Sequence, residues 1–331
     1  MKTIKFIILL VGLPLTACSG QGKDSLALPQ EPAFKIRRFD RELHDYLQEP
    51  AKHQKALEVH YSGFFLPAFG RVTINSSDVG KPEFFERLQK YFSNDMLSQI
   101  YLDELKTFED VSLYERQLSQ AAAVAASELP GSQLPAMCLH VSGFKENVIV
   151  GDNLISVSAD KYLGKDYPVY RQFFEPYRLI QMQSNLITRD YLKAWLLSDL
   201  LPPLKTPKLL DDMVREGKVL FALSRLLPDC PLPDLLGYTP EQETWCNSNE
   251  KQIWRTIVKS NHLYSSDYLL IGRYVNEAPY TATLGAQSPG RVGAWVGWRI
   301  VQAYASKNNV LLAQLFSEDA QKILKASDYN P

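Results

Sequence analysis

Apolar side chains recur at helical spacing through the first part of the chain. In residues 51–69, Leu57, Tyr61, Phe64 and Phe65 fall on one side of a helix, with polar residues between them. Spacings of three and four residues are typical of an amphipathic helix whose apolar stripe faces a core. We expect further helices at residues 41–48, 82–91, 95–105 and 113–129, and a strand at residues 34–40.

The pattern changes in the middle of the chain. Three short apolar runs occupy residues 136–141, 147–150 and 154–158. The last two runs are separated by Gly-Asp-Asn at residues 151–153, which is a turn signal between strands. The sequence therefore predicts a small sheet of three or four strands at the centre of the chain.

Helical patterns return in the second half, and several have clear start signals. Residues 239–242 form a capping box with Pro240 at the first helical position. Other expected starts are the Thr-Pro pair at 206–207, the Ser-Pro pair at 288–289, which would open a helix at 290–305, and Ser317. We predict an α+β fold, a mostly helical single domain at residues 34–331 with a small central sheet.

The N-terminus has the features of an export signal. Lys2 and Lys5 precede an apolar run at residues 6–13, which is shorter than the roughly 20 residues that span a bilayer. The following Leu-Thr-Ala-Cys resembles the lipobox of bacterial lipoproteins, in which the cysteine is acylated, typically with palmitate, after cleavage. We predict a signal peptide at residues 1–17, a lipidated Cys18 that anchors the protein to a membrane, and a flexible tether at residues 18–33. The domain would then lie in the cell envelope, outside the cytoplasm.

Charge and cysteine content narrow the range of partners. The chain has 36 Lys and Arg against 37 Asp and Glu, so we expect no nucleic-acid partner. Cys138 lies in a predicted strand and is expected to be a buried free thiol. Cys230 and Cys246 are close enough in sequence for a disulfide, and the sequence leaves that pairing open.

Motifs for catalysis and metal binding are missing from the sequence. The five histidines include no His-Glu-x-x-His pair, and no Gly-x-Ser-x-Gly elbow or phosphate-binding loop occurs. We therefore name no catalytic residue, metal ligand or cofactor. Asp212 and Glu216 lie four residues apart on one predicted helix face, which suits either paired carboxylates for acid–base chemistry or a solvated surface.

Two features near the C-terminus suggest contacts. Gly290, Gly293 and Gly297 share a predicted helix face, which favours a close helix contact within the domain, or alternatively a groove for a partner. The loop at residues 276–291 has no periodicity, and long loops in compact domains are often functional. We expect Tyr280 and Arg291 to be exposed there and to contact a partner.

Several blocks of sequence, taken together, resemble one family. They are Tyr-Leu-Gly-Lys-Asp-Tyr-Pro at 162–168, the 213–221 segment with Glu-Gly-Lys at 216–218, Leu-Gly-Tyr at 236–238, Gln242, Trp-Cys at 245–246, Asn-Glu at 249–250, Ile-Trp at 253–254, Asp267, Ala-Pro-Tyr at 278–280, and Ser-Pro-Gly-Arg at 288–291 with Gly293, Trp295 and Gly297. Their order resembles the gliding-motility lipoprotein family GldB of Bacteroidota. The resemblance implies a lipoprotein, periplasm-facing and typically at the outer membrane, whose partners are envelope proteins of the gliding and type IX secretion machinery. It implies no catalytic residues.

The layout also resembles that of zinc peptidases with the zincin fold. In those proteins, His-Glu-x-x-His stands on a helix after a small sheet, and a Glu-Gly pair follows on a later helix. Here the corresponding helix is expected at residues 179–200, with Arg189, Asp190 and Lys193 at the motif positions, and Glu216 begins the later pair. Two cations in place of neutral imidazoles would repel zinc. The resemblance implies a pseudo-protease.

These inferences predict a cleft formed by Arg189, Asp190, Lys193, Asp212 and Glu216. The leading hypothesis is a non-catalytic binding or assembly factor that holds a peptide or a partner's tail in this cleft. The alternative is an envelope hydrolase, peptidase-like, that uses acidic residues such as Asp212 and Glu216. A third hypothesis is a general folding or transport factor for exported proteins.

Overall fold

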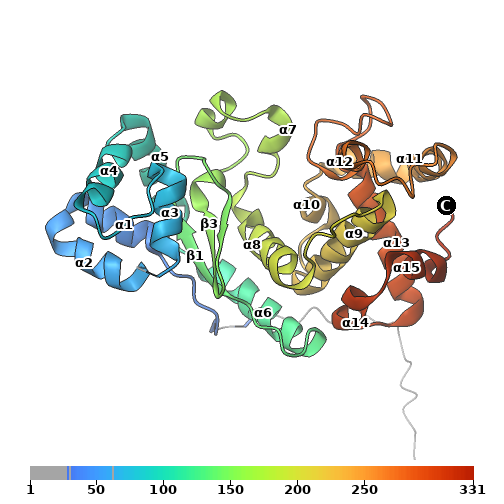
Figure 1. Ribbon diagram of the computed structural model, residues 1–331, viewed down its shortest axis with the longest axis horizontal. Helices are drawn as coiled ribbons and strands as arrows, with labels where there is room; N and C mark the ends of the chain where they lie inside the picture. Colours follow the sequence, from blue (N-terminus) through green and yellow to red (C-terminus); the bar gives the residue numbers. More distant parts are fainter. Residues whose placement is uncertain (1–27, 30, 62) are drawn as a thin grey trace, which may run out of the picture.

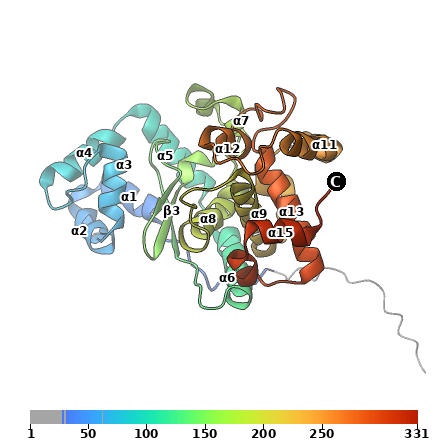
Figure 2. The ribbon, with the colours of Figure 1, turned by 45° about the vertical axis from the view of Figure 1, so that its right-hand side comes forward.

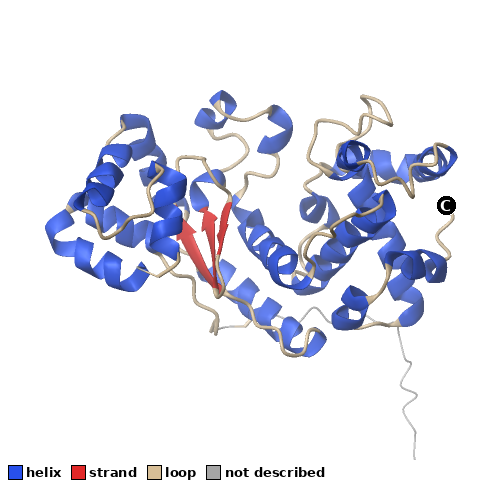
Figure 3. Ribbon diagram, in the orientation of Figure 1, coloured by secondary structure: helices blue, strands red, loops and turns tan. Residues whose placement is uncertain are grey.

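The predicted α+β class is confirmed by the computed structural model, which describes residues 28, 29, 31–61 and 63–331. A three-stranded sheet lies between two groups of helices (Figure 3). The predicted signal peptide, Cys18 and most of the predicted tether lie outside the described residues.

The N-terminal group of helices lies beside the sheet (Figure 1). Its apolar side chains form one core together with sheet residues such as Cys138 and Ile149. Aromatic rings fill that core, and Phe39 packs edge-on against both Phe65 and Phe69. Asn94 starts one of the helices by accepting a hydrogen bond from the Leu97 backbone N–H. The group consists of α1 (Phe39–Gln48), α2 (Pro50–Tyr61), α3 (Phe65–Ile74), α4 (Pro82–Phe92) and α5 (Asp95–Thr107).

Two predictions for this group need correction. The expected strand at residues 34–40 is reduced to a single bridge between Arg37 and Cys138, because α1 already begins at Phe39. The expected helix at residues 51–69 is two helices, α2 and α3. Phe64, at the break between them, is 57% exposed instead of lying in the core.

The central sheet joins the two groups. It has the order β1-β3-β2, with β1 (Ala136–His140) parallel to β3 (Leu154–Ser158) and β2 (Val148–Val150) antiparallel to β3. The register pairs Cys138 with Ser156 across the parallel strands. Nearly all residues of β1 and β3 are buried, as expected for a sheet covered on both faces.

The second group of helices surrounds a larger core. It includes α6 (Ser112–Glu128), α7 (Pro176–Leu179), α8 (Ile187–Trp195), α9 (Leu209–Leu226), α10 (Leu232–Leu236), α11 (Pro240–Lys259), α12 (Tyr268–Val275), α13 (Val292–Asn308), α14 (Leu312–Ser317) and α15 (Ala320–Ser327). The capping box at α11 is confirmed, since Thr239 Oγ1 accepts from the Gln242 N–H and the Gln242 side chain accepts from the Thr239 N–H.

Three other helix starts differ from the prediction. α8 begins at Ile187 and not near residue 179, because α7 and a short 3₁₀ turn come first, and a π turn then covers Leu196–Leu200. α13 begins at Val292 after Arg291, while the Ser288 hydroxyl donates to the Gly285 and Thr281 carbonyls in the preceding loop. The cap of α15 is Asp319, not Ser317.

Helices α9 and α13 lie side by side (Figure 2) in a contact that depends on glycine. A Cβ on Gly297 would overlap the Met213 carbonyl, and one on Gly217 would overlap the Gly297 carbonyl. Gly293 packs in the same way against the Tyr274 backbone. The predicted close contact within the domain is therefore confirmed for Gly293 and Gly297. Gly290 precedes the helix and lies against the Ala278 carbonyl.

Candidate functional site

Helices α8 and α9, which carry the expected cleft residues, contact each other. On α8, Tyr191 and Trp195 are buried one turn apart and fix the helix against the core. This packing leaves Asp190 and Lys193 on the side that faces a cavity. Glu216 lies close enough from α9 to influence the charge of Lys193.

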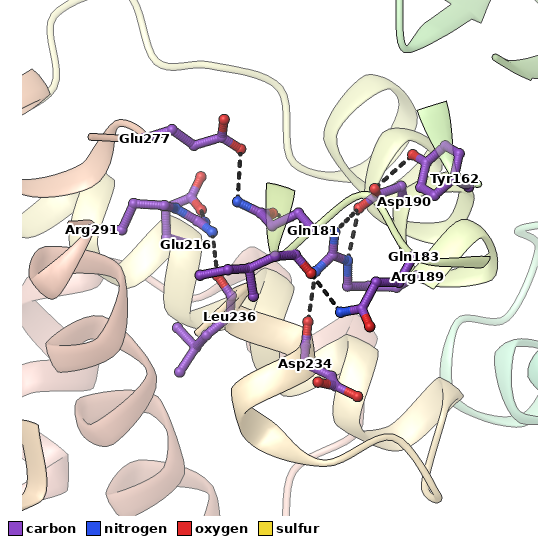
Figure 4. A network of polar contacts seen from close by, with 11 residues as sticks. Tyr162, Gln181, Gln183, Arg189, Asp190, Glu216, Asp234, Leu236, Glu277 and Arg291 are labelled. Carbon is purple, nitrogen blue, oxygen red and sulfur yellow. Dashed lines mark hydrogen bonds and ion pairs between the residues drawn. The ribbon is translucent and has the colours of Figure 1, made fainter. Parts of the chain in front are cut away.

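Arg189 and Asp190 form a closed polar network (Figure 4). Arg189 Nε donates to Asp190 Oδ1 at 2.8 Å, and the Tyr162 hydroxyl donates to the other carboxylate oxygen at 2.7 Å. Arg189 also donates to the Asp234 carbonyl at 2.6 Å and to Gln181 Oε1 at 3.4 Å. Both oxygens of Asp190 thus have partners, and the carboxylate is held in place as a structural group.

Glu216 is tied in a second network around Arg291 (Figure 4). Arg291 Nη2 donates to Glu216 Oε2 at 2.9 Å, and Arg291 Nη1 donates to the Leu236 carbonyl at 2.7 Å. Burial alone would raise the pKa of Glu216, but the cations of Lys193, Arg291 and Arg215 more than reverse this and hold the pKa below its ordinary value. Glu216 is therefore ionised at neutral pH and is poorly suited to donate a proton.

Asp212 lies one turn before Glu216 on α9 but in a different environment. It is half-buried, and burial raises the pKa of its carboxyl group, while Arg215 opposes the rise. The pKa values of Asp212 and Glu216 thus shift in opposite directions, as acid–base pairs require. Neither carboxylate, however, lines the cavity beside α8.

That cavity has a volume of about 270 Å³ and lies between β2, the turn after β3, the α7 segment and α8. Its apolar wall consists of Val148, Phe174, Met182, Ala194 and Leu197. Its charged lining consists of Lys161, Arg178, Asp190, Lys193 and Glu277. Of the predicted cleft residues, Asp190 and Lys193 line this cavity, and Arg189, Asp212 and Glu216 do not.

Other elements contribute two cations to this cavity, Lys161 and Arg178, that were not expected from the sequence. Lys161 ends the 3₁₀ turn that follows β3 and is 8% exposed, with its Nζ donating to Asn147 Oδ1 at 2.6 Å. Burial lowers the pKa of Lys161. A lysine in the turn after a buried strand is a signal that could have identified it. Arg178 and Phe174 belong to an irregular segment and carry no such signal.

The two expected partner contacts behave differently. Tyr280 is 41% exposed on the loop at residues 276–291, as expected. The expectation that Arg291 is exposed is wrong, because it is 6% exposed and its guanidinium group joins α9, α10 and the start of α13. Its backbone adopts the left-handed conformation, with φ of 58°, just before α13 begins.

None of the described thiols and histidines lines this cavity. Cys138, Cys230 and Cys246 are free, so the disulfide that the sequence left open is not formed. His140 is fully buried, with Nδ1 at 2.7 Å from Ser156 Oγ, and burial lowers its pKa to about 3. His262 Nδ1 lies 3.0 Å from the Tyr274 hydroxyl. Within the described part of the chain, no three His, Cys, Asp or Glu side chains are grouped so that they could hold a metal ion.

The fold and the site define a class of protein: a mostly helical α+β domain with a cation-rich cavity where a small sheet meets a helical layer. The family model for the gliding motility protein GldB matches residues 23–331, and the chain belongs to that family. It is therefore a gliding-motility-associated lipoprotein, and its place is in the cell envelope. No curated protein and no solved structure gives a significant match to the chain. Across residues 28, 29, 31–61 and 63–331, no helix combines the length and the apolar character needed to cross a membrane.

Proposed function

We propose that this lipoprotein is a non-catalytic binding or assembly factor of the gliding and type IX secretion machinery. Acylated Cys18 would anchor it to the periplasmic face of the envelope, typically at the outer membrane. The cavity beside α8 would receive a segment of a partner protein. One observation carries the proposal: Asp190 in the cavity lining and Glu216 on α9 are already bonded to arginine, while an apolar wall and the side chain of Lys193 remain available to a ligand.

A catalytic base must reach the proton that it removes, directly or through one water molecule. Asp190 accepts hydrogen bonds from Arg189 and Tyr162, and Glu216 accepts one from Arg291, so neither is free to do this in the present arrangement. Arg189 and Lys193 occupy the positions at which the zinc-peptidase resemblance would require neutral imidazoles. These facts support binding without cleavage over the hydrolase alternative.

Site-specific photocrosslinking in cells tests the binding role. A photoreactive phenylalanine analogue at position 174 would stand in the cavity wall, and one at Val59, which is 70% exposed on α2, would be the control. We expect a discrete envelope partner to be crosslinked from position 174 and not from position 59, and the band to be lost when Lys193 is changed to Glu. Crosslinks to many exported proteins would instead indicate a general folding or transport factor.

A peptidase assay tests the non-catalytic part of the proposal. The purified lipoprotein in detergent is incubated with unstructured protein substrates, with and without a chelator, and products are followed by mass spectrometry. We expect no cleavage above the level of a Glu216→Gln variant. Chelator-sensitive cleavage that this substitution abolishes would contradict the proposal and favour the hydrolase.

A further inference from the structure

Lys193 differs from the other charged groups around it because its charge has no direct partner. Arg189, Asp190, Glu216 and Arg291 are all held by ion pairs or hydrogen bonds at 2.6–2.9 Å. Lys193 Nζ makes neither a hydrogen bond nor an ion pair with any described residue, although the side chain is half-buried and lines the cavity.

The surroundings of Lys193 make this lack of a partner unfavourable. The cation of Arg291 and then burial lower the pKa of Lys193, while the carboxylates of Glu216 and Asp190 act in the opposite direction and Arg189 adds to the lowering. Those two carboxylates are already committed to arginine. A ligand that brings its own negative charge would therefore be stabilised at this position.

Other groups in the cavity support an anionic ligand with an apolar part. Lys161 Nζ donates one hydrogen bond to Asn147 Oδ1 and lies 5.7 Å from the centre of the Phe174 ring. Arg178 is an exposed residue of the cavity lining. The lining carboxylate of Asp190 is neutralised by Arg189, which leaves Glu277 as the opposing charge. Val148, Phe174 and Leu197 supply an apolar surface beside these cations.

We propose that this cavity binds the free C-terminal end of a partner polypeptide, with Lys193 as the counter-ion of the terminal carboxylate and the last side chain against Val148, Phe174 and Leu197. A volume of about 270 Å³ is at the small end of ligand pockets, and it suits the end of a chain better than a segment that must enter and leave. This inference rests on the proposed binding function and specifies its ligand.

Matched peptides provide the test. The full-length lipoprotein in detergent is titrated into fluorescein-labelled hexapeptide pools that have four randomised positions and leucine as the last residue. One pool has a free C-terminal carboxylate, and the other has a C-terminal amide. Hydrogen bonds to a charged group contribute enough that we expect the free carboxylate to bind roughly 10- to 100-fold more tightly. Added NaCl should weaken the carboxylate pool and leave the amide pool nearly unchanged.

Variants assign the effect to Lys193. Lys193→Met keeps most of the apolar stem and should reduce the preference for carboxylate over amide to near unity. Lys251→Met, on the exposed side of α11, is the matched control and should preserve the preference. Circular dichroism checks folding of each variant. If Lys193→Met does not fold, Arg178→Gln at the rim gives the second test, with an expected loss of a few-fold for the carboxylate pool alone.

Each outcome separates this inference from the function on which it rests. Equal binding of both pools would overturn the carboxylate site but leave a peptide-binding function intact. Binding of decanoate without binding of either pool would show that the occupant is a fatty acid, and the inference would be wrong. No binding of any probe, together with a partner crosslinked from position 174, would also reject the chain-end site while the binding role stands.

Discussion

At the scale of single residues, the carboxyl group of Glu104 is notable because it is buried without a hydrogen bond or an ion pair to a described residue. Both of its oxygens lack a hydrogen-bond partner in the described residues. Burial, and then the neighbouring Asp40 carboxylate, raise the pKa of Glu104 well above its ordinary value. Asp40 itself is held by Arg38, whose Nε lies 3.0 Å from one carboxylate oxygen. Glu104 is therefore a source of pH-dependent instability in the N-terminal group of helices.

We expect Glu104→Gln to stabilise the protein at pH 7.5 by roughly 1–3 kcal/mol, because the amide carries no charge to bury. The folded pKa is raised, so the folded state holds the proton more tightly. The stability that protonated Glu104 contributes to the wild type is therefore lost as the pH rises from the ordinary Glu pKa toward the raised pKa of the folded state. The gain of the variant should thus disappear near pH 4, as measured by urea unfolding. Glu86→Gln, on the exposed side of α4, is the control and should change little at either pH. A gain that does not depend on pH would contradict this account.

Glu216 should respond to pH in the opposite sense. Glu216→Gln leaves the buried Arg291 without its ion-pair partner, and we expect a loss of about 2–4 kcal/mol at pH 7.5. Because the folded pKa of Glu216 is lowered, its stabilisation is present above the ordinary Glu pKa and is lost as pH falls through the lowered value. The difference between wild type and variant should therefore shrink in urea titrations at pH 3.

A surface pair gives the reference for that experiment. Glu49 and Lys52 are 62% and 64% exposed and lie 3.3 Å apart. Glu49→Gln should cost less than about 0.5 kcal/mol, since exposed ion pairs contribute little. If Glu216→Gln costs no more than Glu49→Gln, Glu216 is not the buried anchor that the structure indicates.

At the scale of secondary-structure elements, the contact between α9 and α13 organises the second group of helices. The backbones approach so closely that any side chain on Gly217 or Gly297 would overlap a carbonyl of the opposite helix. The same contact places Glu216 beside Arg291, because Gly217 follows Glu216 on α9 and Arg291 precedes α13. Helix packing and the polar network behind the cavity therefore depend on each other.

We expect Gly297→Ala to destabilise the protein by about 3 kcal/mol or more, because the helices must separate to admit a methyl group. Gly63→Ala is the matched control, since a Cβ there would meet nothing within 4 Å and should cause little change. Thermal unfolding by circular dichroism measures both. Equal melting temperatures for the two variants would show that α9 and α13 can move apart freely.

At the scale of the whole molecule, membership in a lipoprotein family gives Cys18 a testable role. Cys18→Ser removes the thiol that would carry the lipid, and without acyl chains we expect the protein to leave the membrane fraction. Each buried methylene of an acyl chain contributes about 0.8 kcal/mol to anchoring. Fractionation of cells and metabolic labelling with palmitate check this expectation. Ser19→Ala is the control and should stay membrane-bound and labelled. Continued membrane association of the unlabelled Cys18 variant would require another anchor.

The sequence determined much of this protein by itself. Local signals predicted the α+β class, a small central sheet and the capping box of α11, and they favoured a close contact at the glycines of α13, because hydrophobic period, caps and missing Cβ atoms act within a few residues. Ordered motifs along the chain were enough to indicate the GldB family.

Only the tertiary structure decided which charges are free. Arg291 looked like a loop residue open to solvent, yet contacts from α9 and α10 bury it and pair it with Glu216. Lys161 and Arg178 reach the cavity of Lys193 from segments 32 and 15 positions earlier in the chain, counted from their residue numbers. The free energy of a charge depends on every element packed around it, and sequence neighbours supply only part of that environment. For this reason the anchored carboxylates and the unpartnered lysine could be told apart only after the chain had folded.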